Sequence, residues 1–264
     1  MEKVSIVILT KNVDHIIGRC LEALKGVSDD IVILDGASTD GTVAICKKYH
    51  ARVYTLYDPE NKVSGAELKN RGIAKAKHDW ILNIDADEIV SPQLKKEIED
   101  IMRHGTSYTG FYIKRRDYAF LNTHIATTTH LRLYRRSKGS FKHTIHERVY
   151  LDGETTTLNG VMDHYSFKDV TDYFTRFNKY TTLEARALYT KNPHPSRISI
   201  LLNAVLRPPV EFCIWYFGKG MWKRGLVAFF FAWLSGFYQF VKYLKYYERT
   251  VENKKSSSLR ANKN

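Results

Sequence analysis

Short apolar runs alternate with helical stretches along the first half of the chain. Each run has the length and β-branched content of a buried strand, and each segment between runs has apolar residues at helical spacing. This alternation predicts an α/β fold with a mixed, mostly parallel sheet and helices on both of its faces. The expected strands are 4–9, 30–34, 53–57 and 80–84, and the expected helices are 16–24, 42–49 and 65–77.

Polar residues follow three of these expected strands. Thr10 and Asn12 come after the first, Asp35 ends the second, and the acidic cluster 85–88 (Asp-Ala-Asp-Glu) follows the fourth. Open sheets of this kind bind ligands beyond the carboxyl ends of their strands. The three motifs together therefore predict one binding site at this edge of the sheet.

The acidic cluster has the chemistry of a cation site. Alternation along a strand puts Asp85 and Asp87 on the same side. Two carboxylates held close repel each other unless a cation lies between them, and oxygen ligands suit Mg²⁺ or Mn²⁺, which neutralise a diphosphate. A lone D-x-D motif is common by chance and can be a solvated acidic turn, but its position after an apolar strand favours a ligand site.

The second half of the chain has a strand-rich pattern first and a helical pattern after it. Ser91 and Pro92 predict the start of a helix, and residues 108–165 have the pattern of strands and loops. Residues 169–189 have helical spacing, which the Asn-Pro-His-Pro sequence at 192–195 interrupts. We therefore expect one α/β domain over residues 1–190, a helical region over 191–252 and a disordered basic tail over 253–264.

The predicted helical region contains a candidate membrane segment. Residues 225–241 form a run of seventeen without a charge, rich in aromatic residues and flanked by Lys223, Arg224 and Lys242. A spanning helix needs about 20 apolar residues, so this run is short for a span. Aromatic residues beside lysines are typical of a helix lying on anionic lipid, which is the favoured interpretation. A buried helix and a true span are the alternatives.

Charge and cysteine content narrow the class of protein further. The formal net charge of +13 over 264 residues indicates an anionic partner: nucleic acid, an acidic membrane surface or a phosphorylated substrate. The acidic cluster and the lack of a recognisable nucleic-acid module count against nucleic acid. The three cysteines form no C-x-x-C pair, which favours a reducing cytoplasm, and the first apolar run lacks the flanks of a signal peptide.

Four residues are candidates for catalysis or ligand binding, and each could instead have a purely structural role. Lys69 could meet a phosphate or belong to a solvated helix face. Glu147 could act as a general base or pair with Arg132 or Arg148. His164 could bind a metal, although a single histidine is more often structural. Asp35 could bind a base or ribose, or it could cap the next helix.

The order and spacing of these segments resemble the family 2 inverting glycosyltransferases of GT-A fold. The resemblance is carried by residues 4–12, 34–42, 69–70 and 79–88. Residues 132–136, 146–147 and 163–166 resemble the subgroup that contains lipopolysaccharide-core β-1,4-glucosyltransferases. That subgroup usually has an Asp-Gly pair where this chain has Lys223-Arg224-Gly225. The resemblance covers residues 3–248 and is weaker after 190.

The resemblance implies a metal-dependent hexosyltransferase that moves a sugar, glucose in that subgroup, from a UDP-sugar with inversion. The implied acceptor is a lipid-linked glycan of the lipopolysaccharide core or another envelope glycan. The implied location is cytoplasmic, peripheral on the inner face of the membrane. The resemblance implies nucleotide binding by five residues: Thr10, Asn12, Asp35, Lys69 and Asp85, with Asp85 near the ribose and Lys69 near the diphosphate. It implies that Asp87 and His164 bind Mg²⁺ or Mn²⁺. It implies that Glu147 is the catalytic base.

Two other functions fit parts of the sequence. A sugar-nucleotide or glycolipid binding protein without transferase activity would keep the same motifs. A nucleic-acid binder is prompted by charge alone and predicts salt-sensitive binding of DNA or RNA.

Overall fold

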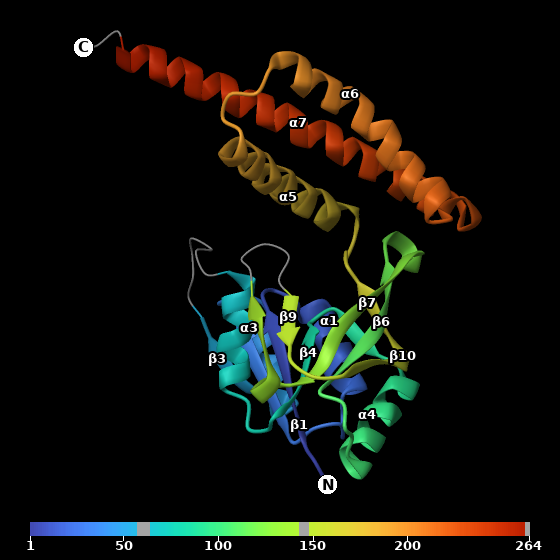
Figure 1. Cartoon of the computed structure of the whole chain (residues 1–264). Helices are drawn as coiled ribbons and strands as arrows, with labels where there is room; N and C mark the ends of the chain where they lie inside the picture. The colour runs from blue at the N-terminus through green and yellow to red at the C-terminus, as the bar shows by residue number, and fades with distance from the viewer. Residues whose placement is uncertain (57–63, 143–147, 262–264) are drawn as a thin grey trace. The chain divides into compact units, whose positions relative to one another are not determined.

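The computed structural model describes residues 1–56, 64–142 and 148–261 (Figure 1). The chain packs into two compact units. The first consists of Met1–Asp117 and Thr127–Ser166, and the second of Tyr118–Ala126 and Phe167–Asn264. Each unit has its own apolar core, so each is described separately.

An eight-stranded mixed sheet forms the centre of the first unit, with the strand order β3-β2-β1-β4-β7-β6-β10-β5. The four N-terminal strands run parallel, and β7 pairs antiparallel with β4. This confirms the predicted mixed, mostly parallel sheet. The strands are β1 (Val4–Thr10), β2 (Asp30–Asp35), β3 (Arg52–Thr55), β4 (Trp80–Asp85), β5 (Glu88–Val90), β6 (Gly110–Tyr118), β7 (His124–Arg135) and β10 (Thr155–Tyr165), with β8 (Gly139–Lys142) and β9 (Arg148–Leu151) as a separate pair.

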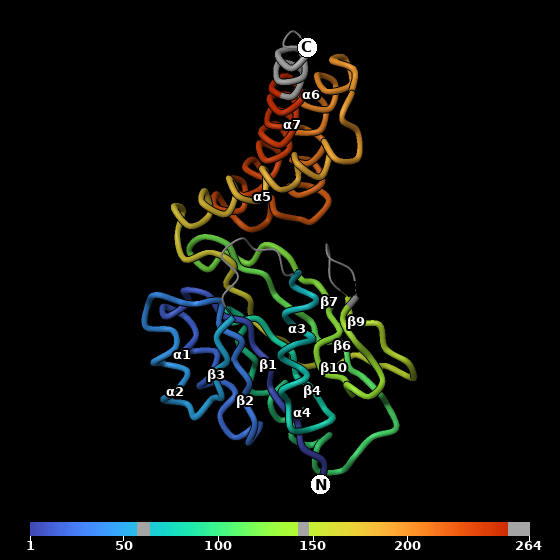
Figure 2. The backbone as a smooth tube through the Cα atoms, turned by 90° about the vertical axis from the view of Figure 1, so that its left-hand side faces the viewer, coloured from blue at the N-terminus to red at the C-terminus, as the bar shows by residue number. Residues whose placement is uncertain are grey.

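Helices cover both faces of the sheet because the strands are apolar on both sides. On β1, Ile6 and Ile8 face one core and Val7 faces the other. The first core includes residues of α1 (Asp14–Ala23), α2 (Thr42–Lys48) and α4 (Pro92–His104), whereas the second includes residues of α3 (Gly65–Ala74). Figure 2 shows α3 running along the sheet beside β1 and β4.

Two local features explain how the helices are placed. Ser91 caps α4 by accepting a hydrogen bond from the Leu94 N–H at 3.2 Å, with Pro92 in the first turn as predicted. A Cβ at Gly72 on α3 would lie 2.6 Å from a methyl group of Leu34, so glycine is required for this helix to lie close to the sheet.

Three long helices dominate the second unit: α5 (Val170–Lys191), α6 (Arg197–Cys213) and α7 (Gly225–Ala261). Helix α7 packs against both others, and its aromatic residues meet those of α5, as in the stacked rings of Phe177 and Phe237. By packing, α5 therefore belongs to the same compact unit as α6 and α7. Short helical turns complete the chain at Phe120–Asn122, Arg136–Lys138, Ile214–Gly218 and Met221–Lys223.

Two prolines, Pro208 and Pro209, lie inside α6. Helix α7 packs closely on α6 at this point: a Cβ at Gly236 would lie 2.6 Å from the Pro208 carbonyl oxygen. Helix α7 extends to Ala261.

Candidate active site

The carboxyl ends of β1, β2 and β4 meet at one edge of the sheet. The register pairs Thr10 with Asp35 and Leu9 with Asp85, because β1 lies between β2 and β4. The three polar motifs that the sequence places at strand ends are therefore neighbours in space. At this edge, Thr10 brings a hydroxyl group, Asn12 an amide group, and Asp35 and Asp85 their carboxylates.

The loops after β1 and β2 are tied together by their own polar side chains. Asp35 is buried and accepts hydrogen bonds from the Thr10 hydroxyl at 3.0 Å and from the backbone N–H and hydroxyl of Ser38. Asn12 accepts a bond from the Thr39 N–H at 2.8 Å and has a left-handed backbone with φ of 52°. Asp35 thus orders this edge, and Asp40 bonds the Thr42 N–H at the start of α2. Contact of Thr10, Asn12 and Asp35 with a nucleoside stays a prediction.

Asp85 lies between two cationic side chains. Its Oδ1 atom is 3.6 Å from Lys69 Nζ on α3, and its Oδ2 atom is 2.8 Å from Arg132 Nη2 on β7. Burial alone would raise the pKa of Asp85, but Arg132 and Lys69 hold it well below its usual range. Lys69 and Asp85, both predicted to bind the nucleotide, thus lie side by side, and Asp85 is an anion near neutral pH.

Glu88, which had no role from sequence, is a buried anchor. It accepts a hydrogen bond from the Asp85 N–H at 2.8 Å, and its side chain is fully buried. Arg132 bonds it directly, and Arg115 Nη1 on β6 lies 3.3 Å away. A buried carboxylate requires such partners, because an unpaired buried charge is strongly destabilising. The anchor fixes the turn that carries Asp85 and Asp87.

Asp87 and His164, the two predicted metal ligands, face each other across β5 and β10. The Nε2 atom of His164 lies 3.5 Å from Oδ1 of Asp87. The strands are held in register because the Tyr165 N–H donates to the Asp87 carbonyl at 3.0 Å and Glu88 pairs with His164. Burial lowers the pKa of His164, but Asp117 and Asp87 raise it to about 9.

This pair fits a divalent cation that also binds a diphosphate. Two metal bonds of about 2.1 Å span at most about 4.2 Å, so one ion can contact both atoms across the observed gap. Magnesium in phosphate-transfer sites commonly has only one or two protein carboxylates, with phosphate oxygens and water as the other ligands. Within residues 1–56, 64–142 and 148–261, no group of three or more His, Cys, Asp and Glu side chains could hold a metal by itself. The arrangement therefore suits an ion that takes its remaining ligands from substrate phosphate and water.

A cavity of about 670 Å³ opens beside Asp85. Lys69, Arg115, Arg132 and Arg148 line it, which makes its wall strongly cationic and suited to an anionic ligand. The predicted base Glu147 lies outside the described residues, together with His143 and His146. The residue that follows it, Arg148, is one of those that line this cavity.

Comparisons with known proteins show the family to which the chain belongs. Residues 5–171 match the model of glycosyl transferase family 2, which covers more than half of the chain. The chain belongs to glycosyl transferase family 2. Together with the mixed sheet, this confirms the predicted GT-A fold and the glycosyltransferase activity.

The similar proteins include bacterial transferases of matching length. The chain is 27% identical over 252 residues to the lipopolysaccharide core biosynthesis glycosyltransferase LpsC of Rhizobium meliloti, covering 92% of this chain and 91% of LpsC. It is 30% identical over 253 residues to an uncharacterized glycosyltransferase of Rickettsia typhi, covering 88% and 80%.

Solved structures resemble the chain more distantly. The S. aureus TarS fragment gives a TM-score of 0.44 at 15% identity and covers 96% of this chain and 92% of the fragment. Glucosyl-3-phosphoglycerate synthase from Mycobacterium tuberculosis, solved with Mn²⁺ and UDP, gives a TM-score of 0.34 at 20% identity and covers 45% of each chain.

Sequence reasoning assigned no role to Arg115 and Asp117, and it considered Arg132 only as a partner of Glu147. Arg115 and Asp117 lie on β6 in a charged stretch, whereas Arg132 lies on β7 between Leu131 and Leu133. The sequence therefore carried a signal for Arg132, since a charged residue between apolar neighbours in a strand must have a charged partner. The sequence does not show which carboxylate that partner is.

Proposed function

We propose that this enzyme transfers a sugar, with inversion, from a UDP-sugar to a lipid-linked acceptor of the lipopolysaccharide core or a related envelope glycan. The observation that carries the proposal is the grouping of Asp85, Asp87, His164 and Lys69 at one sheet edge. A donor with a diphosphate needs cationic partners and a metal, and this edge has candidates for both. The 27% identity with LpsC supports the class of acceptor.

Asp87 and His164 would hold the divalent cation. When bound, the cation would neutralise charge on the diphosphate leaving group. Lys69 would contact the same diphosphate, and Asp85, ionised between Lys69 and Arg132, would lie on the ribose side. Glucose is the proposed sugar, by the resemblance to the glucosyltransferase subgroup.

The proposed reaction is a single displacement. Glu147 accepts the proton of the acceptor hydroxyl. The acceptor oxygen forms a bond to the anomeric carbon while the bond from that carbon to the diphosphate oxygen breaks, and the bonding pair leaves with the diphosphate. Because attack and departure occur on opposite faces of one carbon, the configuration inverts.

The test is a donor screen with Mn²⁺ or Mg²⁺, scored first by thermal shift and then by UDP release with an extracted lipid-linked glycan. We expect a UDP-sugar to stabilise the protein only with the metal. Asp87→Asn should lower kcat/KM by about 100-fold or more. The control is Asp163→Asn, which alters a carboxylate paired with Arg116 at 2.6 Å instead. Metal-dependent binding with neither transfer nor donor hydrolysis would favour the binding-protein alternative.

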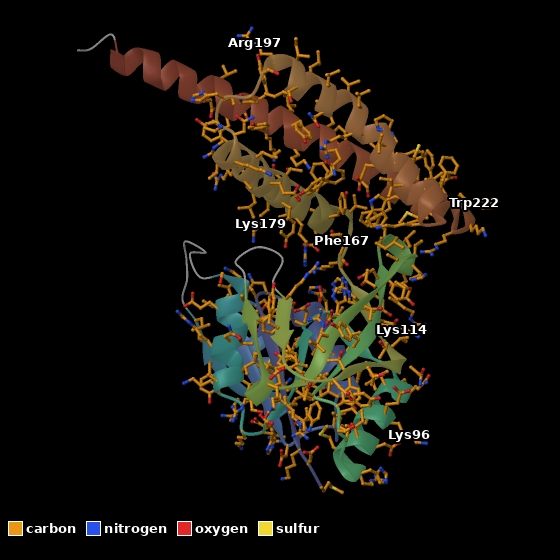
Figure 3. The ribbon with its side chains drawn as sticks, viewed as in Figure 1. Lys96, Lys114, Phe167, Lys179, Arg197 and Trp222 are labelled. Carbon is orange, nitrogen blue, oxygen red and sulfur yellow. The ribbon has the colours of Figure 1, made fainter. Side chains whose placement is uncertain are left out.

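We further propose that α6 and α7 contact the inner, anionic face of the membrane. Two helices, Arg197–Gly218 and Gly225–Glu252, are long and apolar enough by length and composition to cross a membrane. The outer side chains of α6 are exposed, including Leu201, Leu202 and Leu206, each more than half exposed. Basic residues lie at both ends of this surface. Arg197 lies toward one end of α6, and Trp222 lies toward the other (Figure 3). Near Trp222 in the sequence are Lys219, Lys223 and Arg224.

Charge favours a surface position over a span. If α6 and α7 crossed as a hairpin, the connection with Lys219, Lys223 and Arg224 would have to pass through the bilayer. Basic residues are retained on the cytoplasmic side, so such a connection resists transfer. A pair of helices lying flat places its apolar side chains in the interface and its lysines beside anionic headgroups.

A further inference from the structure

His164 is held between two carboxylates that come from different parts of the chain. On one side, its Nδ1 atom lies 2.7 Å from Oδ1 of Asp117 on the adjacent strand β6. On the other, its Nε2 atom faces Asp87 at 3.5 Å. The two ring nitrogens thus have different partners.

Asp117 is itself fixed in place. Its side chain is only 10% exposed. Arg115 Nε lies 2.9 Å from Oδ1, and the Thr128 hydroxyl donates to Oδ2 at 3.3 Å. The carboxylate therefore has one position and is an acceptor.

The consequence for the ring follows from hydrogen-bond chemistry. A ring that binds a cation through one nitrogen keeps its hydrogen on the other, and at Nδ1 that hydrogen can be donated to the Asp117 carboxylate 2.7 Å away. The lone pair is then on Nε2, the nitrogen that faces Asp87. Histidines that bind metals commonly donate their other N–H to a carboxylate, which fixes both tautomer and ring orientation.

We propose that Asp117 is the positioning residue of this transferase, which holds His164 with Nε2 directed at the cation shared with Asp87. The proposal rests on the metal dependence proposed above. It adds a third carboxylate to the site, one that touches neither cation nor substrate. Arg115 links this carboxylate to the buried Glu88, so the anchor under Asp85 and the support behind His164 form one network.

Ser166 is the competing partner of the same nitrogen. Its hydroxyl lies 3.2 Å from His164 Nδ1, farther than Asp117. A hydroxyl can donate or accept, so it cannot fix the tautomer by itself. The Ser166→Ala variant is therefore the matched control for loss of a contact at Nδ1.

The experiment measures Mn²⁺ affinity of the full chain by electron paramagnetic resonance, with and without UDP. Asp117→Asn removes the charge and allows an amide N–H to face the ring. We expect Mn²⁺ affinity to fall by about 10- to 100-fold, the usual effect of losing such a support. Ser166→Ala and Asp163→Asn should change it about twofold or less, and Asp117→Glu should recover part of it.

A double-mutant cycle separates positioning from general stability. In a His164→Gln background, Asp117→Asn should lower Mn²⁺ affinity little further, because the group it positions is gone. An equal loss in both backgrounds would overturn the proposal. Nitrogen NMR of ¹⁵N-histidine protein, with His164 assigned through His164→Gln, adds a second readout. Wild type should show Nδ1 protonated when metal binds, and an Nε2-protonated ring in the metal complex would also overturn the proposal.

The outcomes distinguish this inference from the proposed function. If wild type binds no Mn²⁺ with UDP, the metal dependence fails. If wild type binds Mn²⁺ and His164→Gln weakens binding but Asp117→Asn does not, the metal site stands and the role of Asp117 is refuted. Should Asp117→Asn fail to fold, the Asp117→Glu affinity and the wild-type NMR spectrum still decide the question.

Discussion

The Nη2 atom of Arg132 lies 2.8 Å from Oδ2 of Asp85, and the same nitrogen bonds the fully buried Glu88. One guanidinium thus neutralises both an active-site carboxylate and the anchor beneath it. Arg132 is itself buried, and its pKa is raised because Glu88 and Asp85 outweigh the effect of burial. Its loss would remove a charged partner from both carboxylates and would leave the fully buried Glu88 with Arg115 at 3.3 Å.

Replacing this arginine should therefore destabilise the fold. We expect Arg132→Leu to lower the free energy of unfolding by about 3–5 kcal/mol, the usual cost of removing one partner of a buried ion pair. Denaturant unfolding measures the change. The control is Arg116→Leu on β6, whose side chain is 40% exposed and pairs with Asp163; it should cost about 1 kcal/mol or less. Equal losses in the two variants would contradict the anchoring role of Arg132.

Lys69 should contribute to donor binding rather than to stability. Its ammonium group lies 3.6 Å from Asp85 and lines the cationic cavity. A charge-assisted contact with phosphate is worth about 1.5–3 kcal/mol, so Lys69→Met should raise the Kd for UDP about 10- to 100-fold. Isothermal titration calorimetry with Mn²⁺ present measures this.

The matched control for Lys69 is Lys75→Met, which replaces an exposed lysine just after the same helix. Its Kd for UDP should equal that of wild type. If Lys69→Met also binds UDP like wild type, Lys69 does not contact the diphosphate.

The parallel half of the sheet was predictable because its pattern is local. Strands β1, β2 and β4 are mainly apolar, with Ser5 and Asn83 as interruptions, and polar residues follow each apolar run at once. The parallel arrangement brings those residues to one edge whatever the rest of the chain does. Thr10, Asp35 and Asp85 could therefore be grouped from sequence, and so could Lys69 on the helix between β3 and β4.

The supporting charges were not predictable, because their partners are set by strand order. Strand β7 lies between β4 and β6, so Arg132 contacts Asp85 and Glu88, which are more than forty residues away in sequence. Asp117 meets His164 only because β6 and β10 are neighbours. Alternation along a strand gives the face on which a residue lies and leaves the adjacent strand undetermined.

The pH dependence of stability should include a contribution from His130, which lines the cavity. Burial and the charges of Arg115 and Arg132 lower its pKa from 6.5 to about 4. Between these values the unfolded chain binds a proton that the folded protein does not, so stability falls as pH decreases through this window. Above pH 6.5 the imidazole is neutral in both states and contributes no dependence.

His130→Gln should remove this contribution. Lowering pH from 7.5 to 5.0 should cost wild type about 2 kcal/mol more than the variant, from about 1.36 kcal/mol for each pH unit below 6.5. Urea unfolding at both pH values measures the difference. His15→Gln, at an exposed position of α1, is the control for loss of an imidazole and should follow wild type. Parallel curves for wild type and His130→Gln would contradict the prediction.

The exposed apolar surface of α6 should determine membrane binding. Leu202 and Leu206 are 51% and 56% exposed and lie one turn apart on the same helix face. Burial of a leucine contributes about 1.5–3 kcal/mol, so the double variant Leu202→Asp with Leu206→Asp should bind anionic vesicles at least about tenfold more weakly. Co-sedimentation with vesicles of phosphatidylglycerol and phosphatidylethanolamine measures this, and high salt should weaken wild-type binding through its lysines.

Leu183→Asp on α5, also an exposed leucine at 45%, provides the control and should bind like wild type, since α5 carries charged residues along its length. Equal vesicle binding by the double variant and wild type would exclude α6 as the membrane surface and leave its apolar residues to contact another protein.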